Sequence, residues 1–313
     1  MTLSDYWVSH YVTSTDPTRI QRAMKVARFA SGPDRFELVH FTQDPQALNI
    51  LISQGSGGHA YVFAELAYHL HLAGYNVFIM PKHGGRTVDQ LLVRHRDVIR
   101  FVATEFNDIV GVYGEGLGGY VVFYLALAHA PVSSIACQNS PAVMTEPAYR
   151  EALLADGGPW TKSVRRRRLL LPLVLPLASI APNLKLPVSS YLPWQDLIDT
   201  RPDVRDVERR LVLEGYLKDN DFDRWYPLSA VVSLITTPPP GPLDGLTTPT
   251  MFVVADLGPT PGYIADLYRR LPDIAKKLVQ VDGSVYWMLS HPRDAASLIS
   301  GWFAATLRPE RDI

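Results

Sequence analysis

The chain has a single cysteine among its 313 residues and no excess of charge of either sign. One cysteine cannot form a disulfide within the chain, so a disulfide framework is excluded. Cys137 lies in the apolar run IACQ, and we expect a buried, unreactive thiol there. The 30 Lys and Arg residues offset 31 Asp and Glu residues, giving a formal net charge of −1. Such a chain lacks the positive field of a nucleic-acid-binding protein, so we expect no nucleic-acid partner.

Long hydrophobic runs are also missing. The longest apolar stretch, residues 169–181, contains two prolines and is well short of the roughly 20 residues that cross a bilayer. The first residues, MTLSDYWVSHYVTSTD, show no basic region followed by an apolar run, which is the pattern of a secretory signal. We therefore expect a cytoplasmic protein.

The chain does contain a regular alternation of short β-branched runs with longer helical patterns between residues 36 and 138. This alternation is typical of an α/β protein with a mostly parallel sheet and helices on both faces. Strands are predicted at 36–42 and 47–54, joined as a hairpin across Asp44 and Pro45. A helix is predicted to end at Gly74, and another to begin at Thr87, with Gln90 completing a capping box.

The centre of the predicted fold is a strand over 108–113, a tight turn GEGLGG over 114–119 and an almost wholly apolar helix over 120–130. After the next strand, at 132–138, the alternation stops for about a hundred residues and resumes at 250. We therefore predict a core formed by residues 1–140 and 248–313, with a helical cap inserted at 141–247.

Three segments carry a family resemblance: ILISQGSGG (50–58), AGYNVFIMPKHGG (73–85) and VYGEGLGG (112–119). In this order and spacing the chain resembles the α/β-hydrolase superfamily. Within it, the chain is most similar to the capped lysophospholipase, monoacylglycerol-lipase and serine-aminopeptidase-like group. The resemblance covers residues 47–307 and implies the α/β-hydrolase fold, in which an inserted helical cap covers the central sheet.

The family places its nucleophilic serine in the middle of Gly-x-Ser-x-Gly, where this chain has Gly116. Glycine has no side-chain atom that can attack a carbonyl, so we do not expect ordinary serine-ester hydrolysis. The resemblance places the acid at Gly258 and the base at Tyr286. Asp256, two residues early, and His291, five residues late, are displaced candidates for these roles.

Two origins of this pattern stay open. Departures at all three positions favour a natural loss of the triad. The alternative is an active esterase or lipase in which serine was replaced by Gly116 in the laboratory, with Asp256 and His291 as its partners.

A hydrogen-bond donor pocket is expected to persist beside the turn, because the backbone amides of the loop after the second predicted strand can converge with the amide that follows Gly116. Such a pocket suits a carbonyl, carboxylate or enolate oxygen. We expect a small, largely apolar ligand between core and cap. The candidate ligand-binding residues are Gln54, Gly55, Ser56, Leu117, Tyr286, Trp287 and Trp194.

The remaining titratable residues receive simpler interpretations. We expect Glu115 to point away from the pocket, beneath the sheet, rather than to act as a base on water. His59, His69 and His71 are interpreted as helix-surface residues, because no Asp, Glu or Cys joins them in a metal-binding pattern. We predict neither a metal site nor another cofactor.

The basic run Arg165–Arg168 precedes the apolar stretch of the predicted cap. It is either a solvated charged segment or a weak contact with an anionic lipid surface. Three functions stay open: a ligand-binding protein, with or without non-covalent chemistry such as a cyclisation, lyase or isomerase step; an active esterase; and a non-catalytic scaffold. The sequence specifies neither the ligand nor the oligomeric state.

Overall fold

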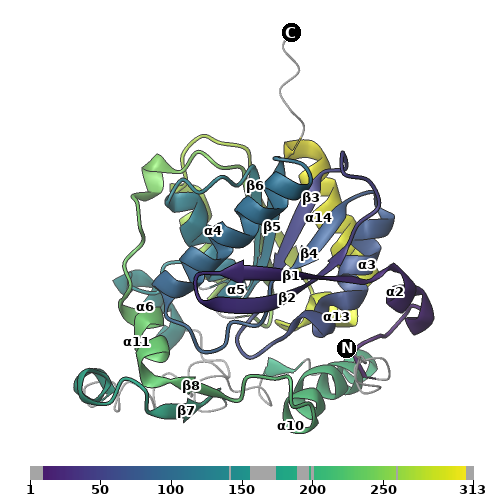
Figure 1. The fold of residues 1–313 in the computed structure, drawn as a ribbon. Helices are drawn as coiled ribbons and strands as arrows, with labels where there is room; N and C mark the ends of the chain where they lie inside the picture. Colours follow the sequence, from purple (N-terminus) through teal and green to yellow (C-terminus); the bar gives the residue numbers. More distant parts are fainter. Residues whose placement is uncertain are drawn as a thin grey trace.

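The structure is a computed structural model that describes residues 10–140, 142–155, 174–188, 197–198, 201–258 and 260–307. Its centre is an eight-stranded sheet with the strand order β1-β2-β4-β3-β5-β6-β9-β10 (Figure 1). The strands are β1 (Lys25–Ser31), β2 (Asp34–Phe41), β3 (Asn49–Ser53), β4 (Asn76–Ile79), β5 (Val110–Glu115), β6 (Ser134–Gln138), β9 (Thr250–Ala255) and β10 (Lys276–Val281). From β4 to β10 neighbouring strands are parallel, as the alternating sequence pattern predicts.

The hairpin that opens the sheet differs from the predicted one. β2 pairs with β1, not with β3, and β4 lies between β2 and β3. Gly32, at φ +58°, makes the tight turn between β1 and β2. Every residue of β3 is buried, and its two edges pair with the parallel strands β4 and β5, so neither edge is left for β2. The predicted pairing of 36–42 with 47–54 is therefore wrong.

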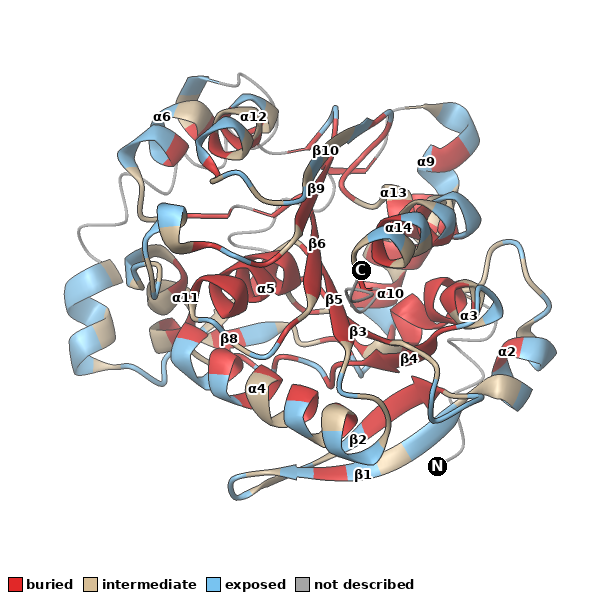
Figure 2. Ribbon diagram, turned by 90° about the horizontal axis from the view of Figure 1, so that it is seen from above, coloured by how far each residue is buried: buried red, intermediate tan, exposed pale blue. Residues whose placement is uncertain are grey.

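Helices cover both faces of the sheet (Figure 2). On one face lie α3 (Ala64–Leu72) and α14 (Pro292–Thr306), and on the other lie α4 (Val88–Glu105), α5 (Leu117–Leu127) and α12 (Pro261–Arg270). The capping box predicted at Thr87 is confirmed, with Gln90 as its second member. All residues of α5 are buried, which agrees with the nearly uniform apolar sequence of this helix.

Most residues described between β6 and β9 lie across the end of the sheet where β5 meets α5, and residues 237–249 then run back to the opposite end, where β9 begins (Figure 1). Their elements are α6 (Pro147–Ala155), β7 (Lys185–Pro187), α9 (Pro202–Glu208), the π-helical η3 (Arg209–Glu214), α10 (Gly215–Lys218), β8 (Trp225–Pro227), α11 (Leu228–Thr236) and the short 3-10 helix η4 (Leu243–Gly245). Of the residues predicted to have roles here, Trp194 and Arg165–Arg168 lie outside the described residues. No helix in the described ranges is long and apolar enough to cross a membrane.

Candidate functional site

The turn between β5 and α5 carries Gly116, which the family resemblance aligns with the nucleophilic serine. Gly116 has φ 53° and ψ −116°, a conformation that glycine adopts with little strain. Its amide donates to the carbonyl oxygen of Gln138 at 2.9 Å, and its own carbonyl accepts from the amide of Tyr120 at 3.0 Å. A Cβ built on Gly118 would lie only 2.1 Å from the carbonyl oxygen of Ser53. The glycine-rich turn thus brings β3 and α5 close together and presents position 116 at the end of the sheet.

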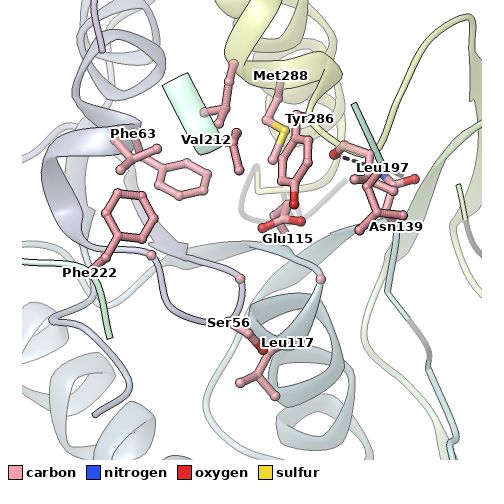
Figure 3. Close-up of a pocket in the computed structure, with 16 residues that line it drawn as sticks. Ser56, Phe63, Glu115, Leu117, Asn139, Leu197, Val212, Phe222, Tyr286 and Met288 are labelled. Atoms are coloured by element: carbon pink, nitrogen blue, oxygen red, sulfur yellow. Dashed lines mark hydrogen bonds between the residues drawn. The ribbon is translucent and has the colours of Figure 1, made fainter. Parts of the chain in front are cut away.

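A cavity of about 90 Å³ lies above this turn (Figure 3). It is smaller than the engineered cavity of about 150 Å³ that admits benzene, so it matches a ligand, or part of a ligand, with few heavy atoms. Its walls are mostly apolar. The lining residues are Gly55, Ser56, Gly58, Val62, Phe63, Glu115, Gly116, Leu117, Asn139, Leu197, Val212, Phe222, Val285, Tyr286, Met288 and Leu289.

Four of the sequence-predicted ligand residues line this cavity: Gly55, Ser56, Leu117 and Tyr286. The first two come from the loop after β3, Leu117 begins α5, and Tyr286 immediately precedes the short helix α13 (Trp287–Ser290). Gln54 is directed elsewhere, because its side-chain amide donates to the carbonyl oxygen of Met80 at 2.9 Å.

Glu115 also faces the cavity, and the prediction that it points away beneath the sheet is wrong. Its carboxyl group lies in the centre of the site, close to the Tyr286 ring (Figure 3). Glu115 is only 8% exposed. A Cβ on Gly55 would lie 2.2 Å from Oε2 of Glu115, so the absence of a side chain at position 55 makes room for this carboxyl group. The orientation of Glu115 depends on Gly55 in the loop after β3, so the sequence next to residue 115 does not predict it.

The surroundings of Glu115 favour its neutral form. Burial raises the pKa of Glu115 to about 8, although a hydrogen bond from the Gly55 amide acts in the opposite direction. Burial also raises the pKa of Tyr286, and the negative charges of Glu115 and Glu208 raise it further. At neutral pH most Glu115 carboxyl groups are therefore protonated and Tyr286 is a neutral hydrogen-bond donor. A buried carboxyl group with a shifted pKa in a cavity is a common mark of a functional site.

Gly258, which the family resemblance aligns with the catalytic acid, has no space for a side chain, because backbone and an amide side chain surround it. A Cβ on Gly258 would lie 2.8 Å from the carbonyl oxygen of Ala255 and 2.9 Å from Oδ1 of Asn139. Asn139 donates through Nδ2 to the carbonyl oxygen of Val285 at 3.0 Å and accepts from the Ala255 amide at 2.8 Å. This residue was not predicted from the sequence, and it joins the ends of β6 and β9 to the segment that carries Tyr286.

The displaced candidates for acid and base have other partners. Asp256 is exposed, and its Oδ1 accepts from the amide of Gly283 at 2.6 Å. His291 is half-buried, with Nδ1 3.0 Å from Oγ of Ser290, and its ring stacks on Trp287 at 6.0 Å. The cavity lining includes none of the described residues Asp256, Trp287 and His291.

Two of the three helix-surface histidines have acidic partners, contrary to the sequence-based expectation. His59 Nε2 lies 3.1 Å from Oδ2 of Asp219, and His69 lies 3.9 Å from Glu65. His59 is also buried rather than on the surface. Each is a pair, however, and the described part of the chain contains no cluster of three or more His, Cys, Asp or Glu residues that could hold a metal ion.

A second serine–histidine contact lies in the interior. Ser53 Oγ is 2.8 Å from Nε2 of His95, whose Nδ1 is 2.7 Å from the carbonyl oxygen of Leu91. Both side chains are fully buried, and burial lowers the pKa of His95 to about 3. Without access to solvent or to the cavity, this pair fixes the end of β3 against α4.

The sequence matches no protein-family model and no functionally curated protein. Solved structures, in contrast, match over nearly the whole chain. A soluble variant of monoglyceride lipase from Saccharomyces cerevisiae, in complex with a substrate analogue, has a TM-score of 0.65 at 12% identity and covers 92% of this chain and 97% of its own. A thermostable carboxyl esterase from Bacillus coagulans, in complex with glycerol, has a TM-score of 0.66 at 12% identity and covers 91% of this chain and 99% of its own.

A monoacylglycerol lipase from Paleococcus ferrophilus is similar as well, with a TM-score of 0.59 at 15% identity over 89% of this chain and 99% of its own. These similarities, with the strand order and the sharp turn at Gly116, show that the chain has the α/β-hydrolase fold. At these identities they establish the fold alone.

Proposed function

We propose that this protein binds a small, largely apolar carbonyl compound in the cavity above Gly116 and does so without forming an acyl-enzyme. The observation that carries the proposal is the hydrogen side chain at position 116, at the tip of a turn that faces a mostly apolar cavity. A covalent intermediate requires a nucleophilic atom there. The amide of Leu117 supplies a donor for a ligand oxygen, whereas in the loop after β3 the amides of Gly55 and Gly57 donate to Glu115 and Tyr226.

Ser56 is a hydroxyl group that also lines the cavity. An activated serine needs an adjacent base that takes its proton. None of the described residues that line the cavity is a histidine. The carboxyl group of Glu115, which also lines the cavity, accepts a hydrogen bond from the Gly55 amide instead. We therefore assign Ser56 to ligand binding rather than to nucleophilic attack.

We also propose that residues 141–247 act as a cap over a core of residues 1–140 and 248–313. The support is that Leu197, Val212 and Phe222 contribute to the cavity lining from outside the core. These side chains give the cavity its apolar upper wall, which favours an apolar ligand. We place the protein in the cytoplasm, because a lone buried cysteine suits a reducing compartment.

The neighbouring structures support a carbonyl compound as the ligand class. One of them is named a monoglyceride lipase and another a carboxyl esterase, and both names denote enzymes that act on esters. A shared fold does not carry a shared reaction. In this chain the same place offers hydrogen-bond donors without the serine hydroxyl.

A direct test combines native mass spectrometry of the purified protein with a fluorophosphonate probe and a short-chain ester assay. We expect a small molecule that dissociates on unfolding, no probe labelling and no ester turnover. Labelling or turnover by the natural protein contradicts the proposal. A cavity that takes up neither a co-purified nor an added carbonyl compound favours a scaffold.

Gly116→Ser gives a sharper test, with Gly116→Ala as its matched control. A Cβ at position 116 meets nothing nearer than Cα of Gly55 at 3.7 Å, so either side chain fits the space. Both variants should lose about 1–3 kcal/mol of stability because φ is positive, and neither should hydrolyse esters. Ester turnover by the serine variant but not by the alanine variant would reveal a working acid and base and would favour the alternative of an esterase whose serine was replaced by Gly116.

A further inference from the structure

The cavity contains one carboxyl group, that of Glu115, among its described lining residues. Its position is set by three neighbours. Gly55 leaves space for it, the neighbouring Gly116 has no side chain, and the hydroxyl end of Tyr286 is directed towards it (Figure 3). The carboxyl group is therefore buried and yet faces the space that a ligand would occupy.

Tyr286 complements this carboxyl group. Its phenol stays protonated because burial and the charges of Glu115 and Glu208 raise its pKa. The other polar side chain at this side of the cavity, Asn139, already uses its amide in hydrogen bonds to Val285 and Ala255. Tyr286 is thus a neutral donor, and it lies next to a group that can take up or release a proton.

We propose that Glu115 and Tyr286 form an acid–base pair that transfers a proton at the carbon atom next to a ligand carbonyl group. This inference rests on the proposed function, because it requires a carbonyl compound in the cavity. Glu115 is the catalytic base and Tyr286 is the donor to the carbonyl oxygen. Gly116 contributes by leaving this space free of a nucleophile.

The step balances without a further reactant. The ionised Glu115 carboxylate takes the proton from the α-carbon, and the electrons of the C–H bond form a carbon–carbon double bond. The carbonyl group becomes an enolate oxygen that accepts a hydrogen bond from the Tyr286 hydroxyl group. In the reverse direction the protonated Glu115 returns a proton to carbon, so the reaction is an enolisation with no oxidant or reductant.

The raised pKa of Glu115 supports this role. A general base is most effective when its pKa is near the working pH, and burial raises the pKa of Glu115 to about 8. The titratable groups near this carboxyl group are the phenols of Tyr113, from the same strand, and of Tyr286. Both phenols have pKa values raised by burial and stay neutral in this range.

The test uses the full chain and acetone, a four-heavy-atom ketone that is smaller than benzene and therefore suited to the size of the cavity. Proton NMR in deuterated water follows replacement of its α-hydrogens by deuterium, and saturation-transfer NMR on the same sample reports binding. We expect exchange above the buffer rate, rising with pH to a plateau with a midpoint near that of Glu115. An exposed carboxylate would already have reached its plateau below neutral pH.

Two variants and one control test whether the exchange depends on Glu115 and Tyr286. Glu115→Gln should lower the exchange rate about 100-fold, within the usual range for a general base, while acetone still binds. Tyr286→Phe should lower the rate and leave the midpoint of the pH profile near that of Glu115. Glu105→Gln, an exposed glutamate at the end of α4, should change neither. Thermal unfolding shows that each variant is folded.

The outcomes separate this inference from the proposed function. Binding of acetone without exchange, or exchange that persists in Glu115→Gln, overturns the acid–base role and leaves ligand binding intact. Absence of binding by the natural protein counts against the carbonyl-binding function itself, and with it against the acid–base pair. Exchange that depends on both residues and follows the Glu115 titration supports the inference.

Discussion

His59, from the loop after β3, is in contact with Asp219, from the residues between β6 and β9, with His59 Nε2 3.1 Å from Oδ2 of Asp219. The same carboxylate oxygen accepts a hydrogen bond from the Tyr11 hydroxyl group at 2.8 Å. The His59 ring packs edge-on against Phe222 at 5.0 Å, and Phe222 lines the cavity. This contact therefore holds one wall of the cavity against the core.

Asp219→Asn tests the strength of this contact. Burial by itself would raise the pKa of Asp219, but hydrogen bonds from His59, the Asp221 amide and Tyr11 outweigh it and hold the pKa at about 2. The lowered pKa means that the ionised carboxylate stabilises the fold above pH 4 and that this contribution is lost as the pH falls towards 2. We expect Asp219→Asn to cost about 2 kcal/mol at pH 7 and progressively less below pH 4.

Urea unfolding at several pH values measures this difference. Asp108→Asn, at an exposed position, is the matched control and should have no effect at any pH. If the difference between Asp219→Asn and the natural protein does not change with pH, then the carboxylate charge is not what stabilises the contact.

Glu115→Gln should have the opposite pH dependence. Because burial raises the pKa of Glu115 to about 8, its contribution to stability is complete below the pKa of about 4.5 in the unfolded chain and is lost as the pH rises to about 8. The variant, which cannot ionise, should match the natural protein at pH 4. At pH 9 it should be more stable by up to about 5 kcal/mol. Chemical denaturation checks this, and a constant difference between the two proteins would contradict the raised pKa.

Substitution of Gly118 should disrupt the turn itself. A Cβ there would lie 2.1 Å from the backbone oxygen of Ser53, and backbone cannot move aside as a side chain can. We expect Gly118→Ala to cost about 3 kcal/mol or more. Gly301→Ala, in α14, meets no atom within 4 Å and should stabilise the helix by about 0.5–1 kcal/mol. Melting temperatures compare the two, and a tolerated Gly118→Ala would show that β3 and α5 can separate.

Cys137 should be chemically silent in the folded protein. The residue is 1% exposed, in β6, and burial raises the pKa of its thiol, so little thiolate is present and reagents cannot reach it. We expect iodoacetamide to label Cys137 in urea but not under native conditions, with mass spectrometry as the measurement. Rapid labelling of the native protein would mean that β6 opens locally.

The sheet and its helices follow closely from sequence because their signals are local. Apolar runs bounded by turns mark β3, β5 and β9, and the capping box at Thr87 marks the start of α4. The opening hairpin did not follow, since β2 pairs with β1 on one edge and with β4 on the other, which leaves no edge for β3. Strand pairing depends on partners distant in the sequence, which a local pattern does not record.

The candidate site also has features that the sequence determines and features that depend on the tertiary structure. The sequence by itself determined that position 116 carries no nucleophile, because the side chain of glycine is a hydrogen atom in any fold. Only the tertiary structure decided that Glu115 faces the cavity, that Asn139 fills the space beside Gly258 and that His59 meets Asp219. Each of these depends on the space left by a residue far away in the chain, and burial in that space is what shifts a carboxyl pKa.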